Sequence, residues 1–146
     1  MMYDLARPER KHRAIQNEKP GPVLESKRCA CGKASPAKVL AQYGKCHGCQ
    51  LADRIATLHD GDLDILRHMV GATDHRPRAR WGFRNEYLVN RRDVDAMMRL
   101  LNVSFVRAGT SLLQHLMYFH ATDLGCRVAG LDAKRTRVAL SLGAKL

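Results

Sequence analysis

The chain has 146 residues, which is enough for one ordinary domain or two very small ones. Apolar residues make up 45% of the sequence, which excludes wholesale disorder, and no apolar run approaches the length of a membrane span. The net charge of +11 indicates attraction to polyanions, nucleic acid first, but net charge alone does not define a binding site.

Residues 1–26 form a basic N-terminal segment. Residues 4–18 predict a short basic helix, and Pro20, Gly21 and Pro22 end it. The segment has no apolar stretch typical of a secretory signal, so we expect a cytoplasmic protein. In such a reducing compartment, closely paired cysteines are metal ligands more often than disulfides.

Four of the five cysteines lie in KRCACGKASPAKVLAQYGKCHGCQ as two close pairs: Cys29, Cys31, Cys46 and Cys49. Zinc takes four such ligands at the corners of a tetrahedron, and Gly32 and Gly48 allow the sharp turns that each pair requires. Four thiolates leave no position for water, so the expected zinc ion is structural rather than catalytic. Basic residues around the pairs would offset the negative charge of the site: Lys27, Arg28, Lys33 and Lys45.

Three alternatives stay open for these cysteines. His47 lies inside the second pair and could replace one sulfur ligand, the four thiols could be reduced without a metal, or a disulfide could form. The fifth cysteine, Cys126, lies alone in an apolar segment, where we expect it to pack as a small hydrophobic residue.

The two pairs resemble the treble-clef and zinc-ribbon families, in which a CxCG loop precedes a second pair whose last cysteine opens a helix. CACGK matches the first knuckle and CHGCQLADRI matches the second, so the resemblance covers residues 27–60. It implies a zinc knuckle. Knuckles of these families serve DNA binding, protein binding or scaffolding alike, so the resemblance does not select a function.

Two helices are expected after the second cysteine pair. CQLADRIATLHD places Leu51, Ile55 and Leu58 on one face. LDILRHMVGA follows with Asp62 as a candidate N-cap. Its expected inward residues are Leu63, Leu66 and Val70.

Residues 72–92 interleave arginines with Trp81 and Phe83, and a short helix is expected over residues 84–89. The next segment, DVDAMMRLL, has apolar residues at helical spacing and Asp93 as a candidate N-cap. Those apolar residues are Val94, Met97, Met98 and Leu101.

The period then changes to that of strands. Residues 103–107 and 115–121 predict two strands joined by a loop of small and polar residues. Thr122 or Asp123 is expected to cap a helix that runs into the basic stretch AKRTRVALSL, and Gly125 and Gly130 predict that this helix is kinked or split.

The order of helices, strand, loop, strand and helix resembles the winged-helix family. DVDAMMRLL would be the recognition helix and VSFVRAGTSLLQHLMYFHA the two-stranded wing. The following junction is similar to the Tyr-x-x-Thr-x-x-Gly ending of winged-helix regulators, with Tyr118 or Phe119, Thr122 and Gly125 at the matching positions. The resemblance implies DNA binding.

Residues 63–131 also resemble a small protein found in tailed phages and prophages, through LRHMVGA and GFRNEYLV. This resemblance implies a phage or mobile-element origin and a bacterial host cell, without an activity.

Eight arginines are the candidate nucleic-acid contacts: Arg76, Arg78, Arg80, Arg84, Arg91, Arg92, Arg99 and Arg107. Asp93 and Asp95 oppose this interpretation, because they would repel phosphates at the start of the recognition helix. The alternatives are that the arginines form a solvated face and that Trp81 and Phe83 are core residues.

No Gly-rich phosphate loop, GxSxG or HExxH motif is present, and no histidine has a partner at metal-ligand or triad spacing. The sequence therefore predicts a protein that is not an enzyme.

The resulting prediction is a mostly helical α+β protein with a zinc-knuckle module at 27–60 and a winged-helix-like domain with a basic C-terminal helix at 61–146. We expect a zinc-containing regulator or accessory protein that binds nucleic acid, DNA rather than RNA, with a homodimer among its expected assemblies. The alternative is a phage-encoded inhibitor of a host protein or ribonucleoprotein complex, such as an anti-CRISPR factor, that acts by protein contact. A third interpretation is a scaffold whose zinc only stabilises a small core.

Overall fold

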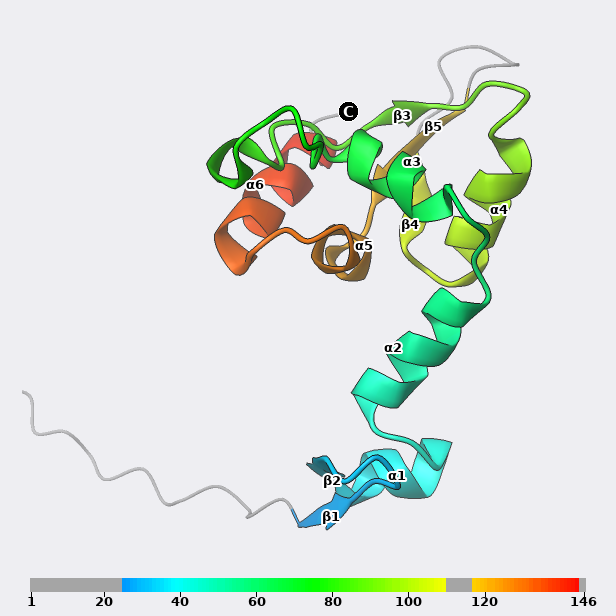
Figure 1. Ribbon diagram of the computed structural model, residues 1–146, viewed down its shortest axis with the longest axis vertical. Helices are drawn as coiled ribbons and strands as arrows, with labels where there is room; N and C mark the ends of the chain where they lie inside the picture. Colours follow the sequence, from blue (N-terminus) through cyan, green and yellow to red (C-terminus); the bar gives the residue numbers. More distant parts are fainter. Residues whose placement is uncertain (1–24, 110–116, 145–146) are drawn as a thin grey trace, which may run out of the picture.

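The computed structural model describes residues 25–109 and 117–144 and confirms the α+β class (Figure 1). The expected helix over residues 4–18 lies outside the described residues. No helix in the described ranges is both long and apolar enough to cross a membrane. The elements are β1 (Ser26–Arg28), β2 (Ala34–Pro36), α1 (Ala37–Tyr43), α2 (His47–Ala56), α3 (Asp62–Met69), η1 (Arg78–Arg80), β3 (Tyr87–Leu88), α4 (Val94–Asn102), β4 (Val106–Ala108), β5 (Tyr118–Ala121), α5 (Asp123–Val128) and α6 (Ala133–Gly143).

The N-terminal part is a small antiparallel hairpin followed by α1. Strands β1 and β2 pair Ser26 with Pro36 and Arg28 with Ala34. Strand β2 and helix α1 were not predicted from the sequence. The next helix, α2, begins at His47, with Cys46 as its N-cap, two residues before the predicted start. Figure 1 shows α2 leading from this hairpin to the rest of the protein.

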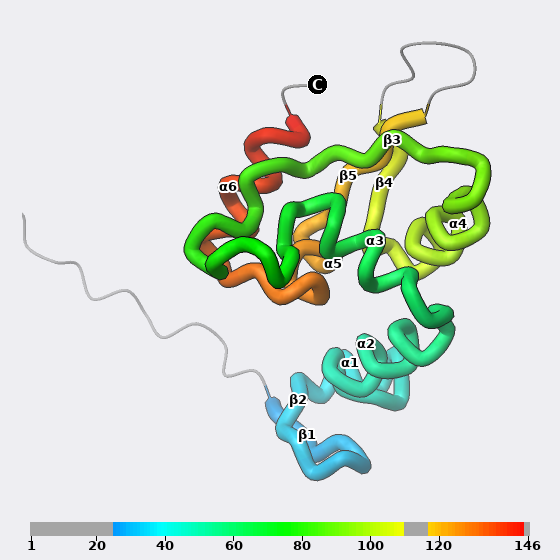
Figure 2. The backbone as a smooth tube through the Cα atoms, turned by 45° about the horizontal axis from the view of Figure 1, so that its top comes forward, coloured from blue at the N-terminus to red at the C-terminus, as the bar shows by residue number. Residues whose placement is uncertain are grey.

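The C-terminal part is built on a three-stranded antiparallel sheet in the order β3-β5-β4. Helices α3, α5 and α6 pack on the central strand β5, and α4 packs on β4. Figure 2 shows the three strands side by side, with α6 to one side of them and α4 to the other. The largest fully buried side chains include Leu66 and Met69 of α3, Met97 and Leu100 of α4, and Phe105, which directly precedes β4.

Helix α2 contacts this core through the predicted face. Leu51, Ile55 and Leu58 pack against the buried cluster, and none of them is fully buried. The expected inward residues of α3 also pack there, with Leu66 and Val70 fully buried and Leu63 partly buried. The apolar spacing therefore located both contacts correctly.

The expected short helix over residues 84–89 is wrong, because this segment forms strand β3 and adds a third strand to the predicted pair. The reason is long-range pairing: Tyr87 lies opposite Phe119. Just before β3, the side-chain amide of buried Asn85 continues the ladder. Its Nδ2 donates to the carbonyl of Ala121 at 3.1 Å, and its Oδ1 accepts from the Ala121 N–H at 2.7 Å.

The expected wing strands are present as β4 and β5, and residues 110–116 between them lie outside the described residues. Thr122 caps α5 as predicted, by accepting a hydrogen bond from the N–H of Gly125 at 3.1 Å. The helix splits at Gly130, whose φ is +96°, and α6 restarts with Asp132 as its cap. The winged-helix and treble-clef resemblances stay predictions.

Two of the expected N-caps act differently. Gly61 is the N-cap of α3, and the Asp62 carboxylate instead accepts from the N–H of His59 at 2.9 Å. Asp93 is the N-cap of α4 by position, but its carboxylate accepts from the hydroxyl of Tyr87 and the amide of Asn90, both at 2.6 Å. In both cases the carboxylate bonds to groups that precede its helix rather than to a backbone N–H of the first turn.

Candidate metal centre

The four paired cysteines are positioned by the β1–β2 turn and by the start of α2. Cys29 follows β1, and Cys31 lies in the turn, where the N–H of Gly32 donates to the Cys29 carbonyl at 2.8 Å. Gly32 has a φ of +83°, a left-handed conformation that glycine adopts without strain. Cys46 is the N-cap of α2, and Cys49 lies in its first turn. The turn and the helix therefore present their sulfurs to the same point.

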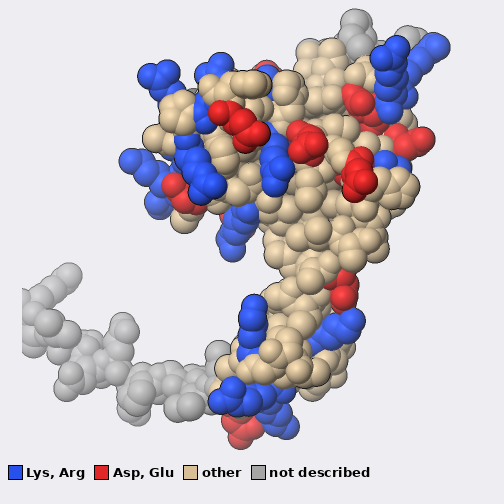
Figure 3. Space-filling model, in the orientation of Figure 1, with Lys and Arg blue, Asp and Glu red and all other residues tan. Residues whose placement is uncertain are grey.

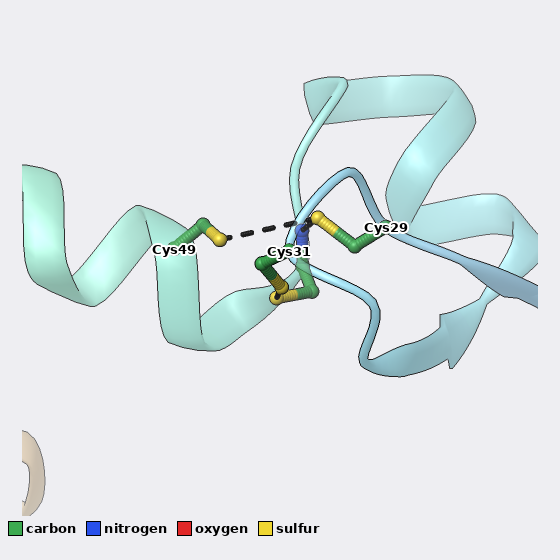
Figure 4. A group of neighbouring side chains, drawn as sticks. Cys29, Cys31 and Cys49 are labelled. Atoms are coloured by element: carbon green, nitrogen blue, oxygen red, sulfur yellow. Dashed lines mark hydrogen bonds between the residues drawn. The ribbon is translucent and has the colours of Figure 1, made fainter.

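The sulfur atoms of these four residues all lie within 4.8 Å of one another. The Sγ atoms of Cys29 and Cys49 are 3.9 Å apart, and those of Cys31 and Cys46 are 3.6 Å apart. A tetrahedron with sulfur about 2.3 Å from a central zinc has edges of about 3.8 Å. Figure 4 shows the labelled side chains of Cys29, Cys31 and Cys49 converging. The donor set and its spacing therefore fit a metal ion bound by four thiolates.

Backbone hydrogen bonds favour the thiolate form at two of the sulfurs. The N–H groups of Cys31 and Cys46 lower the pKa of the Cys29 thiol to about 6, and the second of these N–H groups lies 3.4 Å from its sulfur. The N–H of Cys49 likewise lowers the pKa of Cys46. In contrast, the neighbouring sulfurs of Cys31 and Cys46, together with burial, raise the pKa of Cys49 to about 12. A bound cation would remove this proton, because metal ligation requires the thiolate.

The module around these cysteines has almost no core of its own. Within residues 25–46, only Cys29, Ser35 and Cys46 are buried, and neither α1 nor α2 contains a buried residue. A segment this small cannot offset its conformational entropy through such limited burial. The four-cysteine cluster is thus the only feature of the described module that can hold the hairpin against α2, and this is the role of a structural metal site.

The other candidate ligands lie apart from the cluster. Among the described residues, the cluster that could hold a metal ion consists of the four cysteines and contains no histidine. His47 is exposed at the start of α2. Cys126 is fully buried in the C-terminal core, as predicted, and burial raises the pKa of its thiol to about 11.

Three of the eight candidate arginines are bound within the fold. Arg99 pairs with the buried carboxylate of Asp62, Nη2 of Arg107 donates to the Gly143 carbonyl at 3.0 Å, and Arg84 donates to the His68 carbonyl. Sequence reasoning missed these partners because each of them is at least 16 positions away along the chain. Arg91 and Arg92 are exposed just before α4.

The remaining three arginines lie on a closed loop, residues 71–81, which we call the arginine loop. Its ends meet where the N–H of Gly82 donates to the Val70 carbonyl at 2.9 Å. Inside the loop, Nε1 of Trp81 donates to the Arg76 carbonyl at 3.0 Å, and the N–H of Arg80 donates to the Pro77 carbonyl at 2.8 Å. Internal hydrogen bonds therefore give the loop a defined conformation.

Two guanidinium groups of the arginine loop lie over aromatic rings. The Cζ atom of Arg76 lies 4.3 Å from the ring centroid of Phe83, and that of Arg78 lies 5.5 Å from the ring of Trp81. The Phe83 ring itself rests against the backbone of Gly71, where any side chain would collide with it. No carboxylate of the described residues forms an ion pair with Arg76, Arg78 or Arg80.

Comparison with known protein families, with curated proteins and with solved structures found no match.

Proposed function

We propose that this is a zinc-containing accessory protein that binds nucleic acid, and that its arginine loop contacts the phosphate backbone. The observation that carries the proposal is the arginine loop itself: a hydrogen-bonded loop that displays three exposed guanidinium groups without a carboxylate partner among the described residues. Zinc is the proposed metal of the four-cysteine cluster, because four thiolates with this spacing suit it.

Stacking supports phosphate binding by these arginines. A guanidinium that lies over an aromatic ring keeps its N–H groups directed outward in its own plane, where they can donate two hydrogen bonds to one phosphate. The guanidinium of Arg76 lies over the ring of Phe83 and that of Arg78 over the ring of Trp81 before any ligand arrives. Less side-chain entropy is then lost on binding than with freely rotating arginines.

Helix α4 is less suited to this role than the arginine loop. Its exposed face carries Val94 and Met98, which are 45% and 47% exposed, and its only arginine, Arg99, is bound to Asp62. Asp95 adds negative charge in the first turn. We therefore assign the phosphate contacts to the arginine loop rather than to the predicted recognition helix.

The metal module adds a second basic surface. Figure 3 shows lysine and arginine side chains on the N-terminal module as well as on the part that contains the sheet. In residues 26–52 every charged side chain is basic, and only Lys45 forms an ion pair, with Asp53. A long polyanion that reaches both surfaces would bind more tightly than one that reaches either alone.

The test compares two variants that remove equal charge. Arg78→Gln/Arg80→Gln changes the arginine loop, and Arg91→Gln/Arg92→Gln changes the exposed pair next to Asp93 and Asp95. Binding of a fluorescein-labelled 20-base-pair DNA duplex is followed by anisotropy at several salt concentrations. We expect the loop variant to bind about tenfold more weakly and to lower the slope of log K against log salt by about two, since two phosphate contacts are lost.

The control pair should change affinity by less than about threefold, through net charge alone. Failure of the wild-type protein to bind duplex DNA or single-stranded RNA at low ionic strength would contradict the proposal. Equal losses in the two variants would place the contact elsewhere than on the arginine loop.

A further inference from the structure

A second surface with different chemistry lies between α4 and the sheet. It is a groove of about 370 Å³. Met97, Leu101 and Phe119 form its apolar floor, and Val94, Met98 and Met117 line its edges. The three edge side chains are 45%, 47% and 49% exposed, so large apolar groups meet solvent at this part of the opening. We call this surface the α4 groove.

The edge residues of the α4 groove are not needed for the core. Helix α4 already buries Ala96, Met97 and Leu100 against the sheet. Val94 and Met98 form an adjacent stripe that continues the groove rather than the core, although a soluble helix ordinarily carries polar residues there. A continuous exposed apolar surface of this kind marks an interaction site more often than isolated apolar residues do.

The free charge beside the α4 groove is positive. Arg91 lines the groove, and Arg92 is exposed next to it. Asp93 is occupied by the hydroxyl of Tyr87 and the amide of Asn90. The entrance of the groove therefore presents two cations beside one carboxylate, which leaves a net positive charge.

The other acidic residue of α4, Asp95, lies one helical turn before Arg99, and the guanidinium of Arg99 pairs with Asp62 on α3. The charges beside the groove itself are those of Arg91, Arg92 and Asp93.

We propose that the α4 groove binds an amphipathic helix of a partner protein, with apolar side chains in the groove and acidic side chains against Arg91 and Arg92. Apolar anchors at helical spacing fit a groove of this kind. Nucleic acid does not suit it, because the walls offer methyl and thioether groups rather than donors for phosphate. A second copy of this chain does not suit it either. A two-fold contact through this face would bring the Arg91 and Arg92 pairs of the two copies together. These pairs would repel each other, and each chain carries a net charge of +11.

The test uses a synthetic sixteen-residue helical peptide with Leu at positions i, i+3, i+4 and i+7 and Glu at the positions that flank this Leu face. Its matched control replaces every Glu with Lys. Binding is followed by fluorescence anisotropy and by the ¹³C-methyl signals of the methionines in the full-length protein. We expect the Glu peptide to bind at least about tenfold more tightly than the Lys peptide and to shift the signals of Met98 and Met117.

Two glutamate substitutions at exposed apolar positions locate the site. Met98→Glu places a carboxylate in the groove and should weaken binding of the Glu peptide at least about tenfold. The new charge must lose its water beside the glutamates of the peptide. Val138→Glu changes a 38% exposed residue of α6 outside the groove and should leave binding unchanged. Met98→Leu should retain binding.

Four results would overturn the proposal. They are no binding of the Glu peptide at millimolar concentration, equal binding of the two peptides, equal effects of Met98→Glu and Val138→Glu, and a dimer of the free protein that Met98→Glu converts to monomer in sedimentation velocity. The last of these would assign the groove to a second copy of the chain.

Discussion

The guanidinium of Arg99 on α4 donates two hydrogen bonds to the carboxylate of Asp62 on α3, 2.8 Å from Nε to Oδ2 and 2.9 Å from Nη2 to Oδ1. The Asp62 side chain is 2% exposed and that of Arg99 is 28% exposed. The carboxylate also accepts from the N–H of His59. One buried carboxylate therefore fixes the turn before α3, the first turn of α3 and the middle of α4 together.

Breaking this pair should destabilise the protein. Arg99→Ala leaves the Asp62 carboxylate buried with a single hydrogen bond, and we expect the free energy of unfolding in urea to fall by about 3 kcal/mol. The matched control is Arg127→Ala, which removes a solvent-exposed i,i+4 pair with Asp123 and should cost at most about 0.5 kcal/mol. Similar losses in both variants would refute the structural role of the buried pair.

The same pair should make stability depend on pH in acid. Hydrogen bonds from Arg99 hold the pKa of Asp62 below its ordinary value of 3.8, so the unfolded chain binds this proton more readily than the folded protein. The contribution is fully present above the unfolded pKa and is lost as pH falls through the folded pKa.

We therefore expect the wild type to exceed Asp62→Asn in melting temperature by a constant margin from about pH 7 to pH 5, and by a shrinking margin below about pH 4. Taking the difference between the two proteins cancels the other groups that titrate in acid, the cysteine cluster included. A margin that widens as the pH falls would contradict the assigned direction of the pKa shift.

Removing the metal should unfold the N-terminal module and spare the rest. We expect freshly purified protein to contain about one equivalent of zinc by mass spectrometry, and Cys49→Ser to contain less than about half. Chelation should collapse the amide signals of residues 25–46 into the range of unfolded chains, while Leu66 and Phe105 keep their chemical shifts. Cys126→Ala, which removes the cysteine outside the cluster, should keep its zinc. Loss of zinc from that control, or an ordered metal-free module, would count against the site.

Gly125 should not accept a side chain. A Cβ at this position would collide with the Phe105 carbonyl, a backbone atom that cannot rotate away. We expect Gly125→Ala to lower the free energy of unfolding by about 3 kcal/mol. Gly48→Ala in α2 is the control, because its Cβ would meet nothing closer than 3.9 Å and alanine raises helix stability by up to about 1 kcal/mol. A neutral Gly125→Ala would mean that α5 can move away from the Phe105 backbone at little cost.

The features that local sequence pattern predicted well are those that need few distant partners. The two cysteine pairs have a close spacing that is typical of metal ligands, and the apolar spacing of Leu51, Ile55 and Leu58 follows directly from the helical repeat. Thr122 was found as a cap because its hydrogen bond reaches only three residues along the chain.

The features that the pattern missed depend on long-range partners. Strand β3 exists because Tyr87 pairs with Phe119, and Arg99 is bound because Asp62, 37 positions away, faces it. Nothing in the sequence near Arg99 distinguished it from the exposed Arg91 and Arg92. Net charge could not separate arginines that hold the fold together from arginines that are free to bind a ligand.

Helix α2 and its N-cap carry both candidate metal ligands and core-packing residues. Cys46 and Cys49 fix its first turn to the hairpin, and Leu51 and Ile55 fix its later turns to the core. Each residue of a helix turns the chain by about 100° and advances it by about 1.5 Å. The number of helical residues between the cysteines and the core-packing residues therefore sets the orientation of the metal centre relative to the sheet. One residue inserted after Cys49 would rotate the whole hairpin about the helix axis. Helical phase thus determines which way the basic surface of the module faces relative to the arginine loop.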